Sequence, residues 1–245
     1  MRNIKLTIQY DGTRYAGWQA QDNATAIQTV IEKALKDIVG KKVSLVGSGR
    51  TDAGVHASGQ VANFKTVSKI PIKNVRMALN SALPKDIVIT RVEEAGPGFN
   101  SQRGAKSKIY RYTISNGNFV DPFIRNFAAR CFYKLNPGAM RRASKFLAGR
   151  HDFRAFKTND GGGERNTVRT IKKISIEKEG NLVYIYIEAD GFLYNMARSI
   201  VGTLIEVGRG KMDEERVKMI LAKKDRRLSG PTMEAKGLCL IRVKY

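Results

Sequence analysis

Strand-like and helix-like hydrophobic patterns follow one another along both halves of the chain. Residues 4–10 alternate between apolar and polar side chains, as in a half-buried strand, and the apolar residues of 27–38 recur at helical spacing. By the same criteria we expect further strands at 43–47, 60–66, 86–93, 107–115, 168–178, 181–189 and 237–245, and further helices at 71–83, 137–149, 192–207 and shortly after 213. Helices dispersed among hairpin-spaced strands predict an α+β fold of two similar sandwiches.

The pattern is interrupted once, between Glu94 and Lys106. Gly96-Pro97-Gly98 stands there, and glycine and proline next to each other favour a loop or linker over a regular element. We therefore expect two subdomains, residues 1–104 and residues 105–245. A length of 245 residues allows one large domain or two small ones, and either can bury a sizeable core.

The charge balance is strongly basic. The chain has 44 Lys and Arg against 22 Asp and Glu, a formal net charge of +22. Such an excess on a folded chain indicates a polyanionic partner, nucleic acid first and an anionic membrane surface second. Residues 101–150 carry 11 basic groups and 1 acidic group. A merely solvated basic face is the alternative, but it would normally include interleaved acidic residues, which are almost absent here.

Several classes of protein are disfavoured by what the chain lacks. Two cysteines without CxxC spacing and two histidines do not supply the four clustered ligands of a structural zinc site. The N-terminal residues do not resemble a signal peptide, and no apolar run approaches the roughly 18–20 residues that span a bilayer. We expect a cytoplasmic, reduced protein that uses no membrane and no metal.

One glycine-rich loop carries the residues best suited to chemistry. Gly47 to Ala57 contains three glycines within eight residues, together with Arg50, Thr51, Asp52 and a histidine. A phosphate-cradling loop is disfavoured because the GxxxxGK[ST] pattern is absent. An aspartyl phosphatase is disfavoured because glycine occupies the place of its second aspartate. Two interpretations stay open from the residues alone: Asx-turn chemistry that caps backbone amides, and a nucleophilic or general-base aspartate.

The run GRTDAGVHA, residues 49–57, resembles the signature loop of the tRNA pseudouridine synthase A family. Five further segments resemble the family in order and spacing, so the resemblance covers essentially the whole chain. These segments are 10–19 (YDG to GWQ), 105–112 (AKSKIYRY), 151–153 (HDF), 192–198 (FLYNMAR) and 230–238 (GPT to GL). The chain departs from the family at Asn63, where many relatives carry histidine, and at Ala197, where valine is usual.

The resemblance implies a function. Enzymes of this family convert uridines 38, 39 and 40 of the tRNA anticodon stem-loop to pseudouridine, detaching the uracil at N1 and rejoining it through C5, with no metal or other cofactor. It also implies two α+β halves that share one mostly antiparallel central sheet, with helices packed on one side and an RNA-binding cleft between the halves. The expected partners are tRNA, through its anticodon arm, and a second copy in a homodimer.

The resemblance also assigns roles to five residues. Asp52 is implied as the catalytic nucleophile, attacking the ribose C1′ or the base C6; a first step on the ribose C2′ proton is a third route. Arg198 is implied as its cationic partner, Tyr110 as the ring that packs on the target uracil, and Leu238 as a pocket-lining residue. Arg50 is expected to intercalate near the target base or to grip its phosphate.

Each of these roles has a plainer alternative. Tyr110 and Leu238 fit ordinary core positions of strands, and Arg198 fits a solvated charge on a helix flank. His56, inside the loop, is more readily explained by hydrogen bonds to backbone than by RNA contact. We expect the phosphates of the tRNA to be bound by the basic block 101–150 and by four further cations, Lys223, Lys224, Arg226 and Arg227.

Two other functions compete with the enzyme. A non-catalytic RNA-binding module of two RRM-like sandwiches would carry an RNP1 pattern, and the chain has none. A protein that assembles a ribonucleoprotein through basic surface alone would leave the Arg50-Thr51-Asp52 loop unexplained.

Overall fold

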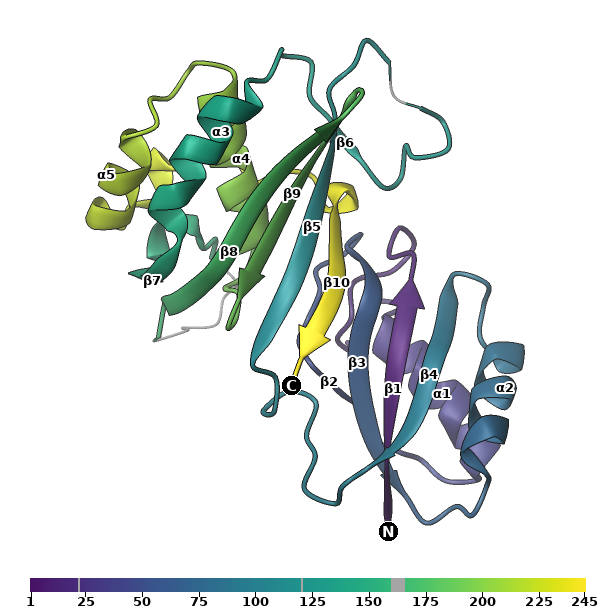
Figure 1. The fold of residues 1–245 in the computed structure, drawn as a ribbon. Helices are drawn as coiled ribbons and strands as arrows, with labels where there is room; N and C mark the ends of the chain where they lie inside the picture. Colours follow the sequence, from purple (N-terminus) through teal and green to yellow (C-terminus); the bar gives the residue numbers. More distant parts are fainter. Residues whose placement is uncertain (22, 120, 160–165) are drawn as a thin grey trace. The chain divides into compact units, whose positions relative to one another are not determined.

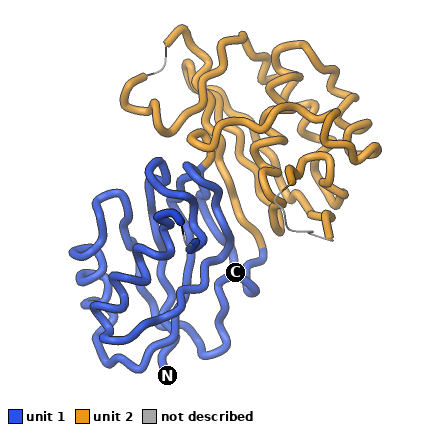
Figure 2. The backbone as a smooth tube through the Cα atoms, turned by 180° about the vertical axis from the view of Figure 1, so that it is seen from behind, with its two compact units in different colours: residues 1–106, 239–245 blue, residues 107–238 orange. Residues whose placement is uncertain are grey.

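The structure is a computed structural model that describes residues 1–21, 23–119, 121–159 and 166–245. The chain divides into two compact units, shown in blue and orange in Figure 2. Unit 1 comprises Met1–Lys106 and Cys239–Tyr245, and unit 2 comprises Ser107–Leu238. The last strand therefore groups with the N-terminal residues. That residues 1–104 and 105–245 behave as separate subdomains stays a prediction.

The sheet of unit 1 has its first strand in the interior. The order is β4 (Ile87–Ala95), β1 (Arg2–Tyr10), β3 (His56–Thr66) and β10 (Leu238–Lys244), with the short β2 (Val46–Gly47) also on β3 (Figure 1). β1 is antiparallel to both of its neighbours, whereas β10 is parallel to β3. Ile4, Leu6 and Ile8 are all buried, as the alternation of residues 4–10 predicts.

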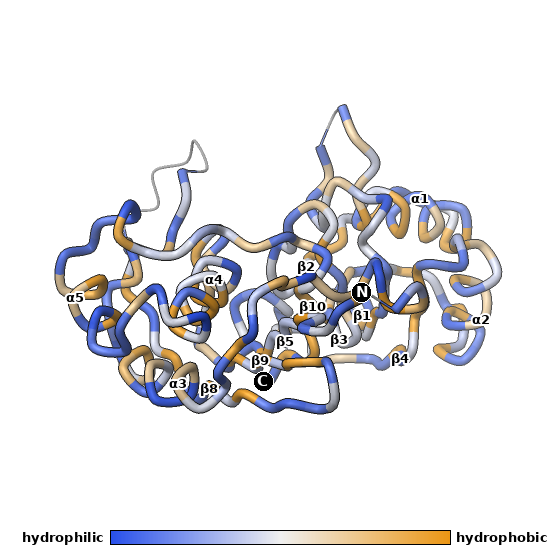
Figure 3. The backbone as a smooth tube through the Cα atoms, turned by 90° about the horizontal axis from the view of Figure 1, so that it is seen from above, coloured by the Kyte–Doolittle hydropathy of each residue, from blue (hydrophilic) through white to orange (hydrophobic). Residues whose placement is uncertain are grey.

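Two helices complete unit 1, α1 (Ile27–Val39) and α2 (Ile72–Ala82), which pack against each other. Hydrophobic and hydrophilic residues alternate along them (Figure 3), as expected of amphipathic helices. α1 ends where Gly40 adopts a left-handed conformation, φ 74°, and donates its N–H to the Lys36 carbonyl. This is a glycine C-cap, and it explains why the helix ends there.

The sheet of unit 2 is antiparallel along β5, β9, β8 and β7. Its strands are β5 (Ser107–Ser115), β9 (Leu182–Ala189), β8 (Val168–Glu179) and β7 (Gly149–Asp152), with β6 (Ala129–Arg130) parallel to β5 (Figure 1). A tight turn joins β8 to β9 through Gly180, φ 54°, with Glu179 opposite Leu182. This is the hairpin that the sequence predicts.

The helices of unit 2 are α3 (Pro137–Ser144), α4 (Met196–Gly208) and α5 (Arg216–Lys223), with single 3₁₀ turns at Lys145–Leu147, Arg154–Phe156, Arg226–Leu228 and Ala235–Gly237. Two of these helices, α3 and α4, are shorter than the sequence predicts. α3 gives way to a 3₁₀ turn before β7 begins at Gly149. α4 begins four residues later than expected because Asn195 adopts a left-handed conformation, φ 59°, which a helix does not tolerate.

The predicted α+β class and the mostly antiparallel strand pairing are confirmed. The strand expected at 43–47 is wrong in length, since only Val46 and Gly47 pair with β3. A single sheet shared by the two halves and a cleft between them stay predictions. Within the described ranges, no helix is both long enough and apolar enough to cross a membrane.

Candidate active site

The loop between β2 and β3 presents the candidate nucleophile. Asp52 is half-buried and Arg50 is exposed. The Val55 N–H donates to the Asp52 carbonyl at 3.1 Å, which closes a tight turn, and Gly54 adopts φ 76° within it. Because a residue with a Cβ atom is strained at this φ, glycine at position 54 is required by the turn that displays Asp52.

The segment 12–18, which follows β1, holds this loop in place through backbone contacts. The Trp18 N–H donates to the Thr51 carbonyl at 3.0 Å, and the Gly54 N–H donates to the Tyr15 carbonyl at 3.3 Å. Gly17 lies directly against the Thr51 carbonyl, and there is no room for a side chain there. The two segments that resemble the family's opening turn and signature loop are therefore one packed unit, and the glycines permit the close approach.

Hydrogen bonds between buried polar side chains also hold the loop in place. The Thr51 hydroxyl lies 2.8 Å from the hydroxyl of Tyr10 on β1. The Ser48 hydroxyl donates to Gln60 Oε1 at 2.6 Å, and Gln60 Nε2 donates to the Gly49 carbonyl at 3.0 Å. Burial raises the pKa of Tyr10 well above its usual value, although the Thr51 hydrogen bond opposes the shift, so the phenol stays protonated.

These supporting residues were missed by sequence reasoning. Tyr10 lies in the segment 10–19 that resembles the family, but as the end of an alternating strand it gives no sign of a supporting role, and Ser48 and Gln60 carry no distinctive spacing. Their signal is burial: Ser48 and Gln60 are both fully buried, and buried polar groups need partners. Burial depends on tertiary packing, which a single sequence does not display.

His56 has the backbone role that the sequence favoured. It is 3% exposed, and its Nδ1 accepts a hydrogen bond from the Gly12 N–H at 3.0 Å. The same nitrogen lies 3.1 Å from an Asp11 carboxylate oxygen. His56 thus ties the start of β3 to the turn after β1.

Tyr110 and Leu238 lie in unit 2 and are both buried. The Tyr110 ring, on β5, stands edge-to-face against Phe192, with ring centroids 4.9 Å apart and an interplanar angle of 81°. Leu238 is the first residue of β10. Burial alone does not separate the role of a core residue from that of a pocket lining, so both substrate-binding assignments stay predictions.

Arg198 is held in a defined orientation at the start of α4. Its Nε donates to the Met233 carbonyl and its Nη1 to Asn195 Oδ1, both at 2.6 Å. Asn195 in turn donates to the Thr158 hydroxyl at 2.7 Å. The side chain is partly buried, so the geometry differs from that of a charge fully solvated on a helix flank.

The C-terminal cations are mostly engaged within the protein. Lys224 Nζ lies 3.2 Å from Asp152, and Arg227 pairs with Asp225 at 2.7 Å. Arg226 is partly buried and donates to the Ser229 hydroxyl and the Gly230 carbonyl. The expected phosphate-binding role of these three is therefore weakened, because each would have to exchange an existing partner for a phosphate.

The five expected site residues fall in both units. Arg50 and Asp52 share one loop of unit 1, whereas Tyr110, Arg198 and Leu238 belong to unit 2. That all five act at one site stays a prediction. Within the part of the chain that the structure describes, no group of three or more His, Cys, Asp and Glu side chains is arranged to hold a metal ion.

A family model and two curated relatives match this chain over most or all of its length. A family model described as tRNA pseudouridine synthase matches residues 6–102 and 143–245. The tRNA pseudouridine synthase A of Thermoanaerobacter sp. (strain X514) is 47% identical over 245 residues, and tRNA pseudouridine synthase A 2 of Clostridium perfringens (strain 13 / Type A) is 49% identical over 245 residues. Both matches cover 100% of each chain. A solved H/ACA ribonucleoprotein bound to a substrate RNA containing 2′-deoxyuridine matches 97% of this chain and 47% of its own, with a TM-score of 0.40 and 11% identity.

Proposed function

Because the chain belongs to the tRNA pseudouridine synthase family, whose members are pseudouridine-forming isomerases, we propose that it converts uridines 38, 39 and 40 of the tRNA anticodon stem-loop to pseudouridine. Asp52 is the nucleophile in this proposal. The observation that carries it is the half-buried Asp52 on a loop that buried hydrogen bonds and close backbone contacts hold in place. Such preorganisation is what covalent catalysis requires of a nucleophile.

The reaction balances without a co-reactant. The bond between ribose C1′ and uracil N1 breaks, the detached base turns, and a bond forms between C1′ and C5. The C5 proton leaves and N1 gains a proton, so substrate and product have the same composition. The Asp52 carboxylate forms a transient bond to C1′ or to C6, or begins by removing the C2′ proton, and is regenerated at the end.

The other residues bind and position the target nucleotide. Arg198 supplies the positive charge that keeps the Asp52 carboxylate ionised in a pocket closed to water, since desolvation alone would favour the neutral acid. Tyr110 packs on the extruded uracil and Leu238 lines the pocket. Arg50, exposed on the same loop as Asp52, holds the adjoining nucleotide or its phosphate.

The target uridine must leave the RNA helix before it can react. A stem uridine is paired and stacked, and extruding it costs a few kcal/mol. Contacts between phosphates and the basic surface, including the 101–150 block, offset this cost and set the register of the tRNA. We propose that the enzyme works in the cytoplasm as a homodimer; light scattering at working concentration gives the oligomeric state.

The decisive experiment compares wild type with Asp52→Asn on an unmodified tRNA transcript, with no cofactor added. Asparagine keeps the shape of the side chain but cannot act as a nucleophile. We expect pseudouridine at positions 38–40 by mass spectrometry with wild type, and a loss of at least about a thousandfold in rate for the variant. The tRNA affinity should stay within about threefold, because the change removes no phosphate contact.

Asp37→Asn is the matched control, since it makes the same change at an exposed position of α1 in unit 1. It should behave as wild type. If wild type binds several tRNAs and converts none of them, the chain is a non-catalytic basic RNA-binding or ribonucleoprotein assembly protein. Full activity of Asp52→Asn would instead remove Asp52 from the mechanism.

A further inference from the structure

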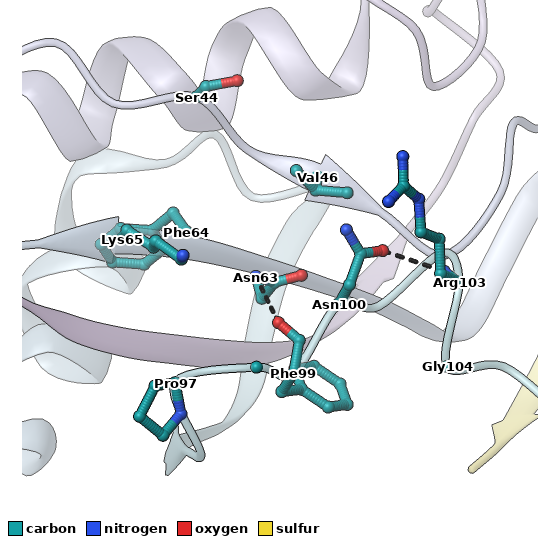
Figure 4. A pocket seen from close by; sticks show the side chains of 11 residues that line it. Ser44, Val46, Asn63, Phe64, Lys65, Pro97, Phe99, Asn100, Arg103 and Gly104 are labelled. Carbon is teal, nitrogen blue, oxygen red and sulfur yellow. Dashed lines mark hydrogen bonds between the residues drawn. The ribbon is translucent and has the colours of Figure 1, made fainter.

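Unit 1 contains two hollows that meet at Val46 on β2. The smaller one has a volume of about 230 Å³ and includes Trp18, Arg50 and Gln102 in its lining. The larger one has a volume of about 680 Å³. Its lining side chains are drawn in Figure 4, with Lys65 from β3 on one side of the view and Arg103 on the other. The smaller hollow is lined in part by Gly49 and Arg50 of the loop that carries Asp52.

The wall between the hollows is the segment 96–104, which has no regular secondary structure but is firmly anchored. Asn3, 2% exposed, donates to the carbonyls of Gly96 and Phe99 at 3.0 and 2.9 Å. Asn63, 4% exposed, donates to Asn3 and accepts the Ser101 N–H at 2.8 Å. Two buried side chains thus satisfy the backbone of the wall.

Further contacts fix the outer part of the wall. The Ser101 hydroxyl donates to the Val46 carbonyl at 2.5 Å, and the Tyr245 hydroxyl donates to the Ser101 carbonyl at 2.9 Å. Asn100 Oδ1 accepts the N–H groups of Gln102 and Arg103. The wall therefore presents Gln102 to the smaller hollow and Arg103 to the larger one without having to order itself on binding.

The charged side chains in the lining of the hollows are cationic, which favours an anionic ligand. Arg50, Arg103 and Lys65 are exposed, and among the described residues none of the three has an ion-pair partner. Among the residues that the structure describes, no carboxylate lines either hollow. The other polar groups in the lining include the amides of Gln19, Asn100 and Gln102, which both donate and accept hydrogen bonds.

Stacking on an aromatic ring is not the basis of recognition in the larger hollow. The Phe99 ring packs against the Tyr245 ring, with centroids 5.0 Å apart, and Lys5 Nζ lies 5.5 Å from its centroid. Since both contacts occupy the ring, charge and amide hydrogen bonds are left to bind a ligand. Phosphate and ribose match these groups, because Arg and Lys bind phosphate oxygens and amides bind ribose hydroxyls.

We propose that the two hollows form a subsite for the RNA strand that adjoins the target uridine. Arg103 and Lys65 bind two of its phosphates, and Asn100 and Gln102 bind ribose hydroxyls or base edges. The subsite deepens the proposed function, on which it rests for the identity of the RNA. The larger hollow falls within the range of about 300–1,000 Å³ that is usual for ligand sites, whereas the smaller one suits a sugar or a phosphate.

The test is a double variant, Arg103→Gln with Lys65→Gln, in the full chain. The matched control is Lys73→Gln with Lys85→Gln, two exposed lysines of unit 1 that do not line either hollow. Both variants lower the net charge equally. Neither Arg103 nor Lys65 donates a side-chain hydrogen bond within the described residues, so we expect both proteins to melt within about 2 °C of wild type.

We expect the double variant to bind an unmodified tRNA transcript about tenfold more weakly at 0.1 M salt. The slope of log Kd against log salt should fall by about 1.4, which is two phosphates at about 0.7 each for single-stranded RNA. The control should change affinity less than about twofold. The single-turnover rate at saturating tRNA is measured alongside, because it separates an effect on binding from an effect on the chemical step.

Equal affinity and equal salt slope for the double variant and its control would overturn the subsite and leave the Asp52 result untouched. If wild type forms no pseudouridine but the double variant still loses affinity and slope, the proposed function fails and the RNA subsite stands. A loss of the saturating rate with unchanged affinity would also overturn the subsite, because the residues would then act on the chemistry instead of the strand.

Discussion

The hydroxyl groups of Tyr10 and Thr51 lie 2.8 Å apart in the buried interior of unit 1. Tyr10 ends β1, and Thr51 immediately precedes the candidate nucleophile Asp52. The same Thr51 accepts the Trp18 N–H through its carbonyl. The backbone next to the carboxylate is thus tied to the first strand and to the segment 12–18, which limits how far Asp52 can move.

Replacing Tyr10 by phenylalanine should cost about 1–2 kcal/mol in the free energy of unfolding, because the buried Thr51 hydroxyl loses its partner. We expect kcat to fall about tenfold. This corresponds to an increase of about 1.4 kcal/mol in the activation free energy, caused by a less accurate position of Asp52. Affinity for tRNA should stay within about twofold. Urea unfolding and single-turnover assays measure these quantities.

The other side of this hydrogen bond can be tested at Thr51. Thr51→Ser keeps the hydroxyl and should retain more activity than Thr51→Val. Equal losses of activity in the two variants would argue against positioning by this hydrogen bond.

Gly17→Ala tests the contact between the segment 12–18 and the loop. At φ 93° and with the Thr51 carbonyl against it, an alanine Cβ is strained twice. We expect a loss of at least about 2 kcal/mol in stability, from backbone strain together with steric overlap. Gly40→Ala is the control, since Gly40 has φ 74° but nothing within 4 Å of an added Cβ, and should cost about 1 kcal/mol. If both variants lowered the melting temperature by a similar amount, the loop would be able to move away from the added methyl group at position 17.

Arg198→Lys separates charge from geometry at the start of α4. Lysine keeps the positive charge but cannot reproduce the two hydrogen bonds to Met233 and Asn195 in their fixed directions. We expect turnover to fall at least about tenfold, one pair of charge-assisted contacts being worth roughly 1.5–3 kcal/mol. Affinity for tRNA should change little. Wild-type turnover in Arg198→Lys would show that a positive charge alone is sufficient.

Asp86 gives a pH-dependent prediction. Burial raises its pKa, but hydrogen bonds from Tyr15 and Arg14 outweigh burial and hold the pKa below its usual range. A carboxylate with a depressed folded pKa stabilises the fold above its unfolded value of about 3.9, and this stabilisation is lost as pH falls through the lower folded value. Asp86→Asn should therefore have a lower melting temperature than wild type at pH 7. The difference in melting temperature should decrease below about pH 4.

Thermal melts of both proteins at pH 7, 5 and 3 check this prediction. The Asp86 carboxylate also anchors Tyr15, whose carbonyl accepts the Gly54 N–H of the loop, and burial raises the pKa of Tyr15 to about 12. If the difference in melting temperature between wild type and Asp86→Asn stayed constant from pH 7 to pH 3, Asp86 would act through its shape and not through its charge.

Local patterns were sufficient for most of the elements. The alternation of residues 4–10 predicted β1, and Gly40 predicted the end of α1, because side-chain alternation along a strand and helix capping depend on neighbouring residues. The ends of elements were less accurate. α4 begins at Met196 because Asn195 is left-handed, and its side chain donates to Thr158, a partner far away in the sequence.

The sequence by itself determined the α+β class, the basic character and the loop that carries Asp52, since these depend on residue order and composition. Only the tertiary structure decided which polar residues hold that loop. Tyr10 on β1 and Gln60 on β3 meet the loop residues Thr51, Ser48 and Gly49 because the two strands pair, although the strands lie far apart in the sequence. The anchored wall of the RNA subsite arises in the same way, from Asn3 and Asn63 on those two strands. A buried hydrogen bond is specified by three-dimensional packing, and no spacing along one chain displays it.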